Sequence, residues 1–388
     1  MMTIKSFRTA TLPQLIFGVG HIKQVAKIAR QHGTLALLVT GRRSFVAAHS
    51  LLEALDYEGV KYKQVTIEGE PSPSQIDAIV AQHPHMEVVI GLGGGAVIDA
   101  GKAISAMLPI QQPIKQFLEG VGDQKPPGLK VPYIACPTTA GTGAEVTKNA
   151  VITEVGPNGF KKSLRHDHYI PNVVVIDPAL ACSCPPDVTA SCGMDALTQL
   201  LEAFVSTASN PFTDAFARSG LKAVARSLSR AVTHPNDLEA RSDMAWAAYA
   251  SGVSLAHAGL GIVHGLASPI GGYYPIPHGV VCGTLLPAAT QENIRWLLEH
   301  DPDGEALAKH IEVASLFGHH TLDKIDTSYA LADTFQKFKE AFAIADLSHW
   351  SVGVETRILD KTGLKNNPAQ LNREEITHLL IQAGVCHA

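Results

Sequence analysis

Short apolar runs alternate with segments of helical periodicity over the first part of the chain. Runs rich in β-branched residues predict strands at 35–40, 62–67, 87–93, 131–138 and 172–178. Amphipathic stretches of helical period lie between several of these runs. Strands that are apolar throughout and alternate with helices are typical of a mostly parallel sheet covered on both faces. Such a sheet binds its ligand outside the carboxyl ends of its strands.

From about Pro185 onward, the strand-like runs give way to long helical patterns. Helices are predicted at 194–206, 214–232, 241–268 and 374–384. A chain of 388 residues also favours two domains. We therefore predict an α/β domain over residues 1–180 and an all-helical domain over residues 181–388. The cleft between two such domains is the expected active site.

Composition and charge narrow the class of protein. Hydrophobic residues make up 46% of the chain and charged residues 17%, which is typical of a folded globular protein. A net charge of −5 without a basic run argues against a nucleic-acid partner. No apolar stretch predicts a membrane span, and the first residues lack the pattern of a secretory signal.

The cysteines give a further indication of the compartment. They stand at positions 136, 182, 184, 192, 282 and 386 and match no disulfide framework. We therefore expect reduced thiols in a cytoplasmic protein. Cys182 and Cys184 form a C-x-C pair that could bind a metal, but an incidental pair in a proline-rich loop is the simpler interpretation.

Two polar loops follow predicted strands. Gly93, Gly94 and Gly95 join a buried strand to a helix, where free helix N–H groups can bind a dinucleotide pyrophosphate. A tight turn without a ligand is the alternative for this loop. The run PTTAGTGAEVT at 137–147 follows the next strand and carries several threonine hydroxyls. A threonine-rich helix cap is its alternative. Two such loops at one sheet edge favour ligand binding over both alternatives.

Side chains suited to a metal occur in the helical half. Asp195 and Gln199 are four residues apart on a predicted helix, so both leave the same face. His264 and His278 follow further along the chain. Aspartate and histidine are suitable ligands for Fe²⁺ or Zn²⁺. Most of the 18 histidines must be surface or structural residues, and His264 taken alone is more often a core histidine than a ligand.

Four segments in order resemble the signature segments of the iron-containing alcohol dehydrogenase family. They are GLGGGAVIDAGK, PTTAGTGAEVTKNAVIT, GMDALTQLLEAFVS and AGLGIVHGLASPIGGYYPIPHGV. The resemblance covers most of the chain. It implies an amino-terminal Rossmann-like dinucleotide-binding domain followed by an all-α metal-binding domain, an architecture shared with dehydroquinate synthase.

The resemblance also assigns roles to residues of this chain. The pyrophosphate and its loop are assigned to Gly94, Gly95, Ala96 and Asp99. The nucleotide and nicotinamide are assigned to Thr138, Thr139, Thr142, Thr147, Asn149 and Lys161. Metal ligands are implied at Asp195, His264 and His278. The family usually has serine where this chain has Ala96, which removes one hydroxyl but leaves the backbone donors.

One departure bears on the choice of cofactor. The family often has an acidic residue where this chain has Gly41, after the first predicted strand, and that carboxylate repels a 2′-phosphate. Here Gly41 is followed by Arg42 and Arg43. Loss of the acid and gain of two guanidiniums predict a preference for NADPH over NADH. The alternative is that both arginines are ordinary surface residues.

Three further departures surround the implied metal. Gln199 stands where the family commonly has histidine, and an amide oxygen is a weaker ligand. Ser268 replaces a second histidine of the family that is placed to relay a proton. His257 replaces a common asparagine and, on a continuous helix, would lie about 10 Å from His264 on the same face. We therefore predict a substrate-pocket or relay role for His257, with helix packing as the alternative. Tyr273 and Tyr274 are expected near the substrate.

The predicted function is NAD(P)-dependent, metal-assisted alcohol dehydrogenation or aldehyde reduction. A metal- and NAD-dependent lyase like dehydroquinate synthase is the alternative enzyme, but it needs several cations for its substrate, and the segments around the implied metal are poor in lysine and arginine. A metal-free reductase of the same superfamily and a non-catalytic binding protein are two further interpretations. The expected partner is a small alcohol or aldehyde, with neither nucleic acid nor membrane, and the expected assembly is a homodimer.

Overall fold

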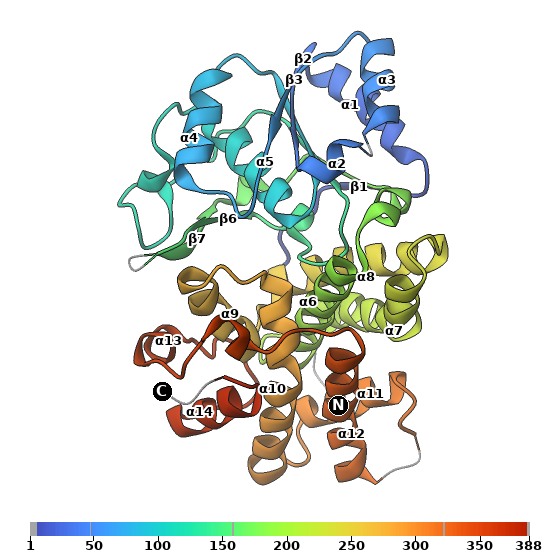
Figure 1. Cartoon of the computed structure of the whole chain (residues 1–388), viewed down its shortest axis with the longest axis vertical. Helices are drawn as coiled ribbons and strands as arrows, with labels where there is room; N and C mark the ends of the chain where they lie inside the picture. The colour runs from blue at the N-terminus through green and yellow to red at the C-terminus, as the bar shows by residue number, and fades with distance from the viewer. Residues whose placement is uncertain (1–5, 47, 157–158, 321–322, 386–388) are drawn as a thin grey trace.

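A parallel sheet forms one end of the molecule and a body of helices forms the other (Figure 1). The computed structural model describes residues 6–46, 48–156, 159–320 and 323–385. The six strands of the sheet are β1 (Gln14–Phe17), β2 (Leu35–Thr40), β3 (Lys61–Thr66), β4 (Val88–Gly93), β5 (Tyr133–Pro137) and β8 (Val173–Ile176). They are paired in the order β1-β8-β5-β4-β2-β3, and every pair is parallel.

All five predicted strands belong to this sheet, and three others were not predicted. The edge strand β1 has only four residues, too few for a periodic signal. A separate antiparallel hairpin consists of β6 (Asn149–Glu154) and β7 (Phe160–Arg165). Four of the six residues of β7 are polar, so this strand lacks the apolar run that identified the others.

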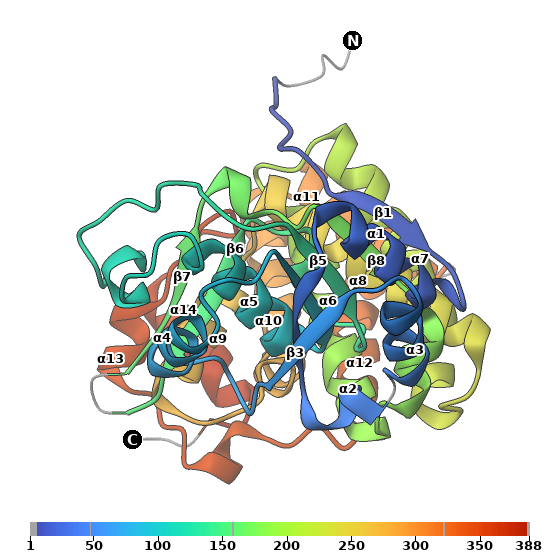
Figure 2. The ribbon, with the colours of Figure 1, turned by 90° about the horizontal axis from the view of Figure 1, so that it is seen from above.

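Helices cover both faces of the sheet, as the apolar runs predict. They are α1 (Gln24–His32), α3 (His49–Tyr57), α4 (Pro73–Gln82) and α5 (Gly95–Met107). Leu37 and Val39 of β2 pack into the cluster that contains α4 and α5. Ala36 and Leu38 belong to the cluster on the opposite face, with α1 and α3. The alternation of side chains along a strand accounts for this division. Figure 2 views these layers from above.

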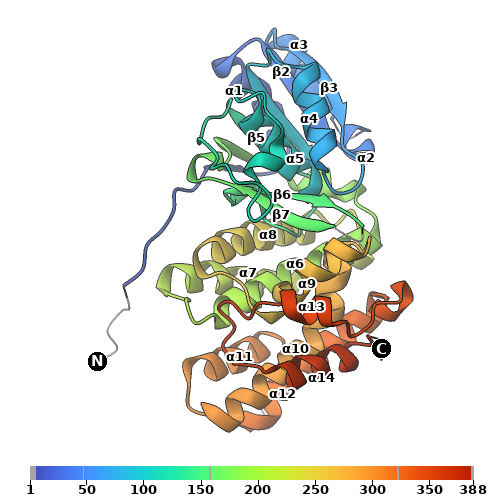
Figure 3. The same ribbon diagram turned by 90° about the vertical axis from the view of Figure 1, so that its left-hand side faces the viewer.

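The remaining chain is helical. Its helices are α6 (Pro186–Val205), α7 (Pro211–Thr233), α8 (Leu238–Ala258), α9 (Ile262–Tyr273), α10 (His278–His300), α11 (Glu305–Leu316), α12 (Lys324–Ala341), α13 (Thr356–Lys361) and α14 (Arg373–Gln382). One apolar core joins α6, α7, α8, α11 and α12, and another joins α9, α10, α13 and α14. Figure 3 shows these helices stacked beneath the sheet and its hairpin. The α/β half followed by an all-helical half confirms the predicted fold class.

The prediction of one helix over residues 241–268 is wrong. The chain breaks between α8 and α9, and the two helix axes meet at 99°. Gly259, with φ of +70°, ends α8 in a conformation that favours glycine. The apolar pattern continues across the break because both helices are largely buried, so periodicity alone did not reveal it. His257 and His264 therefore lie on different helices.

Contacts between the two halves include one at Gly252 of α8 and one at His257. Gly143 lies so close to Gly252 of α8 that a Cβ on Gly252 would be 2.4 Å from the Gly143 carbonyl oxygen. Residues 6–13 leave the sheet at β1 and run past the helical layer (Figure 3). There the Ala10 N–H donates to Nε2 of His257 at 2.9 Å.

No single helix in the described ranges is long and apolar enough to cross a membrane. The bent pair α8 and α9 together has the length and apolar composition of such a segment, but on those two grounds alone. The five cysteines within those ranges are free thiols. Cys386 lies outside the described residues.

Candidate functional site

A cavity of about 430 Å³ opens at the carboxyl ends of the strands. Its lining includes Gly41, Arg42 and Arg43 after β2, Glu68 after β3, Gly94 after β4, and Thr138 and Thr139 after β5. The chain passes from β2 outward to β3 and then back to β4 on the other side of β2, so the cavity lies where the strand order reverses. Ligands of open α/β sheets bind at such a position.

The two polar loops pack directly against each other behind this cavity. A Cβ on Gly94 would lie 3.2 Å from Oγ1 of Thr139, and a Cβ on Gly95 would lie 2.7 Å from Oγ1 of Thr142. Both glycines therefore leave room for threonines of the neighbouring loop. Ala96 follows Gly95 in the first turn of α5. The free N–H groups of that turn are donors suited to an anion.

A buried lysine fastens the second loop to α5. Lys102 donates from Nζ to the Ala144 and Asn149 carbonyl oxygens, both at 2.7 Å, and to Oγ1 of Thr147 at 3.1 Å. Asp99 lies one turn before it, with Oδ1 3.9 Å from Nζ. Burial lowers the pKa of Lys102 and raises that of Asp99. Thr147 and Asn149, which the resemblance assigns to the cofactor, are thus bound to Lys102.

Lys161 lies on the hairpin and Ser268 on α9 of the helical half. Lys161, on β7, has Nζ 3.4 Å from Oε1 of Glu70 and packs beside Gly271 of α9. Both Lys161 and Glu70 contribute to the charge environment of His278. Ser268 is exposed on α9. Figure 3 shows the hairpin facing α9 across this boundary.

The tyrosines expected near the substrate are covered by α13. Arg357 lies over the ring of Tyr273 at 4.3 Å and over that of Tyr274 at 6.0 Å. The Tyr274 hydroxyl donates to Glu355. Packing against Glu355 and Arg357 therefore explains the positions of both tyrosine rings without a substrate.

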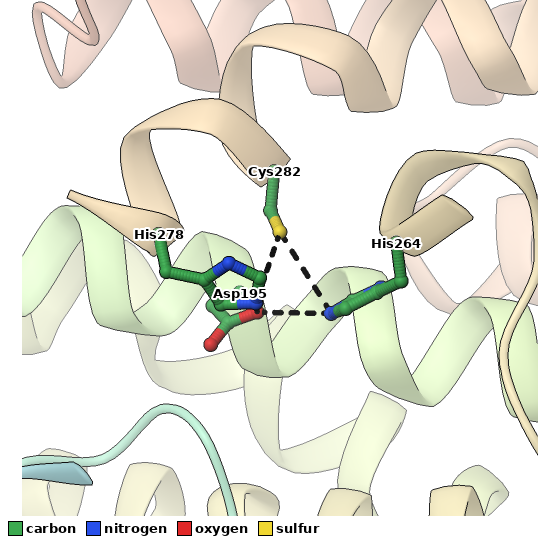
Figure 4. Close-up of side chains that lie close together, drawn as sticks. All are labelled: Asp195, His264, His278 and Cys282. Carbon is green, nitrogen blue, oxygen red and sulfur yellow. Dashed lines mark hydrogen bonds and ion pairs between the residues drawn. The ribbon is translucent and has the colours of Figure 1, made fainter. Parts of the chain in front are cut away.

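Four potential metal ligands converge from three helices. The donor atoms of Asp195, His264, His278 and Cys282 all lie within 4.8 Å of one another (Figure 4). Asp195 is on α6, His264 on α9, and the other two on α10. The Asp195 side chain is 2% exposed, that of His264 7% and that of His278 23%. This is the one such group of His, Cys, Asp and Glu in the part of the chain that the structure describes.

Glu202 orients the buried histidine. Its Oε2 accepts from Nδ1 of His264 at 2.6 Å, and its Oε1 accepts from the Val263 N–H at 2.7 Å. With the proton held on Nδ1, the lone pair of Nε2 points into the group of donors. A carboxylate that fixes the tautomer of a histidine in this way is typical of metal sites.

Asp195 supplies a test of whether a cation fits. Its Oδ1 is buried and has no hydrogen-bond partner among the described residues, although Nε2 of His264 is only 3.3 Å away. With Nε2 unprotonated, His264 presents a lone pair to that oxygen, so two acceptors face each other unless a proton or a metal cation lies between them. Buried polar atoms without partners are rare. A cation among these donors would satisfy both acceptors, so the residues fit a metal.

The surroundings of the cluster shift the pKa values of both His264 and His278. Burial alone lowers the pKa of His264, but Cys282, Glu202 and Asp195 outweigh burial, and the pKa lies well above its ordinary value. Burial lowers the pKa of His278, which keeps this second imidazole neutral. The cluster therefore attracts positive charge and retains a neutral imidazole able to bind a metal.

Two predicted residues have other partners. Gln199 is buried on α6, and its Oε1 accepts from the Ser251 hydroxyl at 2.7 Å. His257 uses both ring nitrogens, because Nδ1 donates to the Val253 carbonyl oxygen at 2.7 Å and Nε2 accepts from Ala10. The expected common face with His264 does not exist, because the helix breaks between them. Packing thus accounts for His257 without a relay role.

Sequence reasoning missed Cys282 and Glu202. Cys282 follows His278 by four residues, and Glu202 follows Asp195 by seven, so each shares a helix face with a predicted ligand. That spacing was the available signal. It was overlooked because a buried cysteine and a glutamate among leucines also suit an ordinary core helix.

We expect Glu202→Gln to weaken metal binding by about ten- to a hundredfold, because loss of the carboxylate frees the His264 ring. Chelator competition measures the affinity. Glu239→Gln changes an exposed carboxylate on α8 and should have no effect. Equal affinities in the two variants would contradict an orienting role for Glu202.

Family models match both halves of the chain. The model described as iron-containing alcohol dehydrogenase matches residues 13–178. The model described as Fe-containing alcohol dehydrogenase family, C-terminal, matches residues 189–384. Together the two matches cover most of the sheet half and of the helical half.

Individual relatives extend this similarity over the full length. Alcohol dehydrogenase 4 of Saccharomyces cerevisiae is 30% identical over 386 residues, covering 96% of this chain and 97% of that protein. A crystal structure of a 1,3-propanediol oxidoreductase has a TM-score of 0.86 at 29% identity and covers 98% of this chain and 100% of its own. Sulfoacetaldehyde reductase from Bifidobacterium kashiwanohense, solved in complex with NAD⁺, has a TM-score of 0.83 at 27% identity, with coverage of 97% and 99%.

Proposed function

Because the chain belongs to the iron-containing alcohol dehydrogenase family, we propose that it is an NAD(P)-dependent, metal-assisted alcohol dehydrogenase or aldehyde reductase. Its substrate is a small alcohol or aldehyde. The observation that carries the proposal is the buried Asp195 Oδ1, which lacks a hydrogen-bond partner among the described residues and faces two histidines.

The sheet half binds the cofactor in this proposal. Gly94 and Gly95 let the first turn of α5 approach the pyrophosphate, and Thr138 and Thr139 line the same cavity. Lys102 holds the threonine loop against α5 through its three hydrogen bonds. The cofactor, when bound, supplies the hydride chemistry.

The helical half orients the substrate oxygen. Asp195, His264 and His278 hold the metal, which when bound acts as a Lewis acid on that oxygen. Glu202 fixes the His264 ring, and the apolar core around α9 and α10 excludes water from its buried side. His278 is the most exposed of the three and lies on the side nearest Lys161 and the cofactor half.

We propose NADPH as the preferred cofactor. Gly41 brings no carboxylate to the cavity, so nothing at that position repels a 2′-phosphate. Arg42 is paired with Glu68 at 2.6 Å, which offsets its charge. Arg43 has no ion-pair partner within the described ranges and lines the same cavity. A free guanidinium is well suited to a phosphate.

Gly41→Asp should lower the ratio of NADPH to NADH efficiency by at least about tenfold, or ~1.4 kcal/mol, because the added carboxylate repels the 2′-phosphate. There is room for it, since a Cβ at Gly41 would lie 3.4 Å from the nearest atom, Oγ of Ser44. Gly41→Asn adds the same volume without charge and should change the ratio little. Measurement of kcat/KM with each cofactor tests this, and a wild type that prefers NADH would contradict the assignment.

The function itself is tested by nicotinamide absorbance with a series of small aldehydes and alcohols. We expect turnover that is lost on chelation and restored by Zn²⁺ or Fe²⁺. Full turnover after complete metal removal would favour the metal-free alternative. Absence of turnover with either cofactor across the series would contradict the proposed function.

The same proposal includes a homodimer in the cytoplasm. The assembly follows from the family resemblance, and the free thiols at the five described cysteines are consistent with a reducing compartment.

A further inference from the structure

Cys282 is placed to act as more than a packing residue. Its side chain is fully buried among apolar neighbours of α9 and α10. Yet its Sγ lies 3.7 Å from Nε2 of His264 and 3.7 Å from Nε2 of His278. Figure 4 shows the sulfur above the line that joins His264 to Asp195, on the side from which α10 approaches.

These separations resemble the edges of a tetrahedral zinc site. Bond lengths of about 2.0–2.1 Å to nitrogen or oxygen and about 2.3 Å to sulfur place neighbouring donors roughly 3.3–3.6 Å apart in a tetrahedron. Oδ1 of Asp195 lies 3.3 Å from Nε2 of His264 and 3.8 Å from Nε2 of His278. All six separations lie within 4.8 Å, so side-chain rotations that shorten the longer ones would bring all four donors to one ion.

A second observation points to a ligand independently of the cysteine. Asp195 is buried, and its Oδ1, which faces the same space, has no hydrogen-bond partner among the described residues. If Cys282 were only a packing residue, the Asp195 Oδ1 would still lack a hydrogen-bond donor or cation. A shared cation would satisfy that oxygen.

Gln199, the other polar residue on this face of α6, already has a hydrogen-bond partner. Gln199 lies one turn beyond Asp195, but its Oε1 accepts from Ser251. The α6 helix therefore offers one free donor and α10 offers two, His278 and Cys282, four residues apart on one face.

We propose that the Cys282 thiolate is the fourth protein ligand of the metal, and that this Asp/His/His/Cys set makes the site selective for zinc over iron. Thiolate is a soft ligand that favours Zn²⁺, whereas carboxylate and imidazole also suit Fe²⁺. The inference rests on the proposed function only in that the site holds a metal.

X-ray absorption at the zinc edge tests the ligand directly. In zinc-loaded wild type we expect a sulfur neighbour at about 2.3 Å. Cys182→Ser, which removes a thiol outside the cluster, should retain this neighbour. Cys282→Ser should lose it and bind zinc at least about tenfold more weakly in chelator competition. Bound zinc without a sulfur neighbour in wild type would overturn the inference and leave the proposed function intact.

A double variant keeps the test independent of folding defects. Cys282→Ser combined with Gln199→His moves the fourth donor back to the face of α6 that carries Asp195. We expect this variant to recover zinc affinity while its zinc-to-iron binding ratio, measured anaerobically with both metals, falls below that of wild type. An unchanged ratio would overturn the selectivity. Wild type that binds neither metal would overturn the inference and the metal part of the proposed function together.

Discussion

Asp195→Asn should lower kcat/KM by about three orders of magnitude, since a metal's stabilisation of developing charge contributes several kcal/mol and each 1.36 kcal/mol is tenfold in rate. The substitution preserves volume but removes the one carboxylate in the cluster of Asp195, His264, His278 and Cys282. The remaining donors would hold a cation with one negative charge fewer. Metal analysis of the purified variant should show less than stoichiometric loading.

A matched control lies on the same helix. Asp187 is exposed in the first turn of α6, two turns before Asp195. Asp187→Asn removes the same charge and should leave kcat/KM and metal content unchanged. If Asp195→Asn kept most of its activity with metal loss, the cluster would not be the catalytic centre.

Lys102→Met should lower the free energy of unfolding by roughly 3–5 kcal/mol, the typical cost of removing one partner from a buried ion pair. Methionine fills the volume but leaves the Ala144 and Asn149 carbonyl oxygens without their donor. It also leaves two buried carboxyl groups, Asp99 and Glu145, without the nearby positive charge. Denaturant unfolding measures the change.

Lys115→Met is the control for loss of a lysine at the surface. Its Nζ pairs with Glu154, but both side chains are nearly half exposed. Such pairs contribute about 1 kcal/mol or less. Similar losses for the two variants would mean that Lys102 acts as an ordinary ion-pair partner and does not anchor the loop.

The sheet half was predictable because burial on both faces leaves a direct signal. Strands such as Leu35–Thr40 are apolar throughout, and polar glycine-bearing loops after two of them marked the ligand edge. The hairpin β6–β7 was not predictable by the same rule. Most residues of β7 are polar, and its pairing with β6 depends on a partner that the local pattern does not identify.

Only part of the metal site could be predicted from the sequence. Asp195, His264 and His278 were assigned by resemblance, whereas Glu202 contacts His264 from a helix 62 residues away in sequence. The break at Gly259 turns α9 through 99° so that His264 meets Glu202 of α6. Periodicity places Glu202 on the same helix face as Asp195 but does not give the angle between helices, so its contact with His264 could not be predicted.

All four donors of the cluster come from α6, α9 and α10, and none comes from the sheet. By mass action, a ligand that binds only the folded state adds about 4.1 kcal/mol at a free concentration a thousandfold above its Kd. Under the proposed function, we therefore expect metal concentration to change the stability of the helical half first, and nucleotide concentration to change that of the sheet half. The resistance of the helical half to proteolysis is then expected to depend on the metal concentration, and that of the sheet half on the nucleotide concentration.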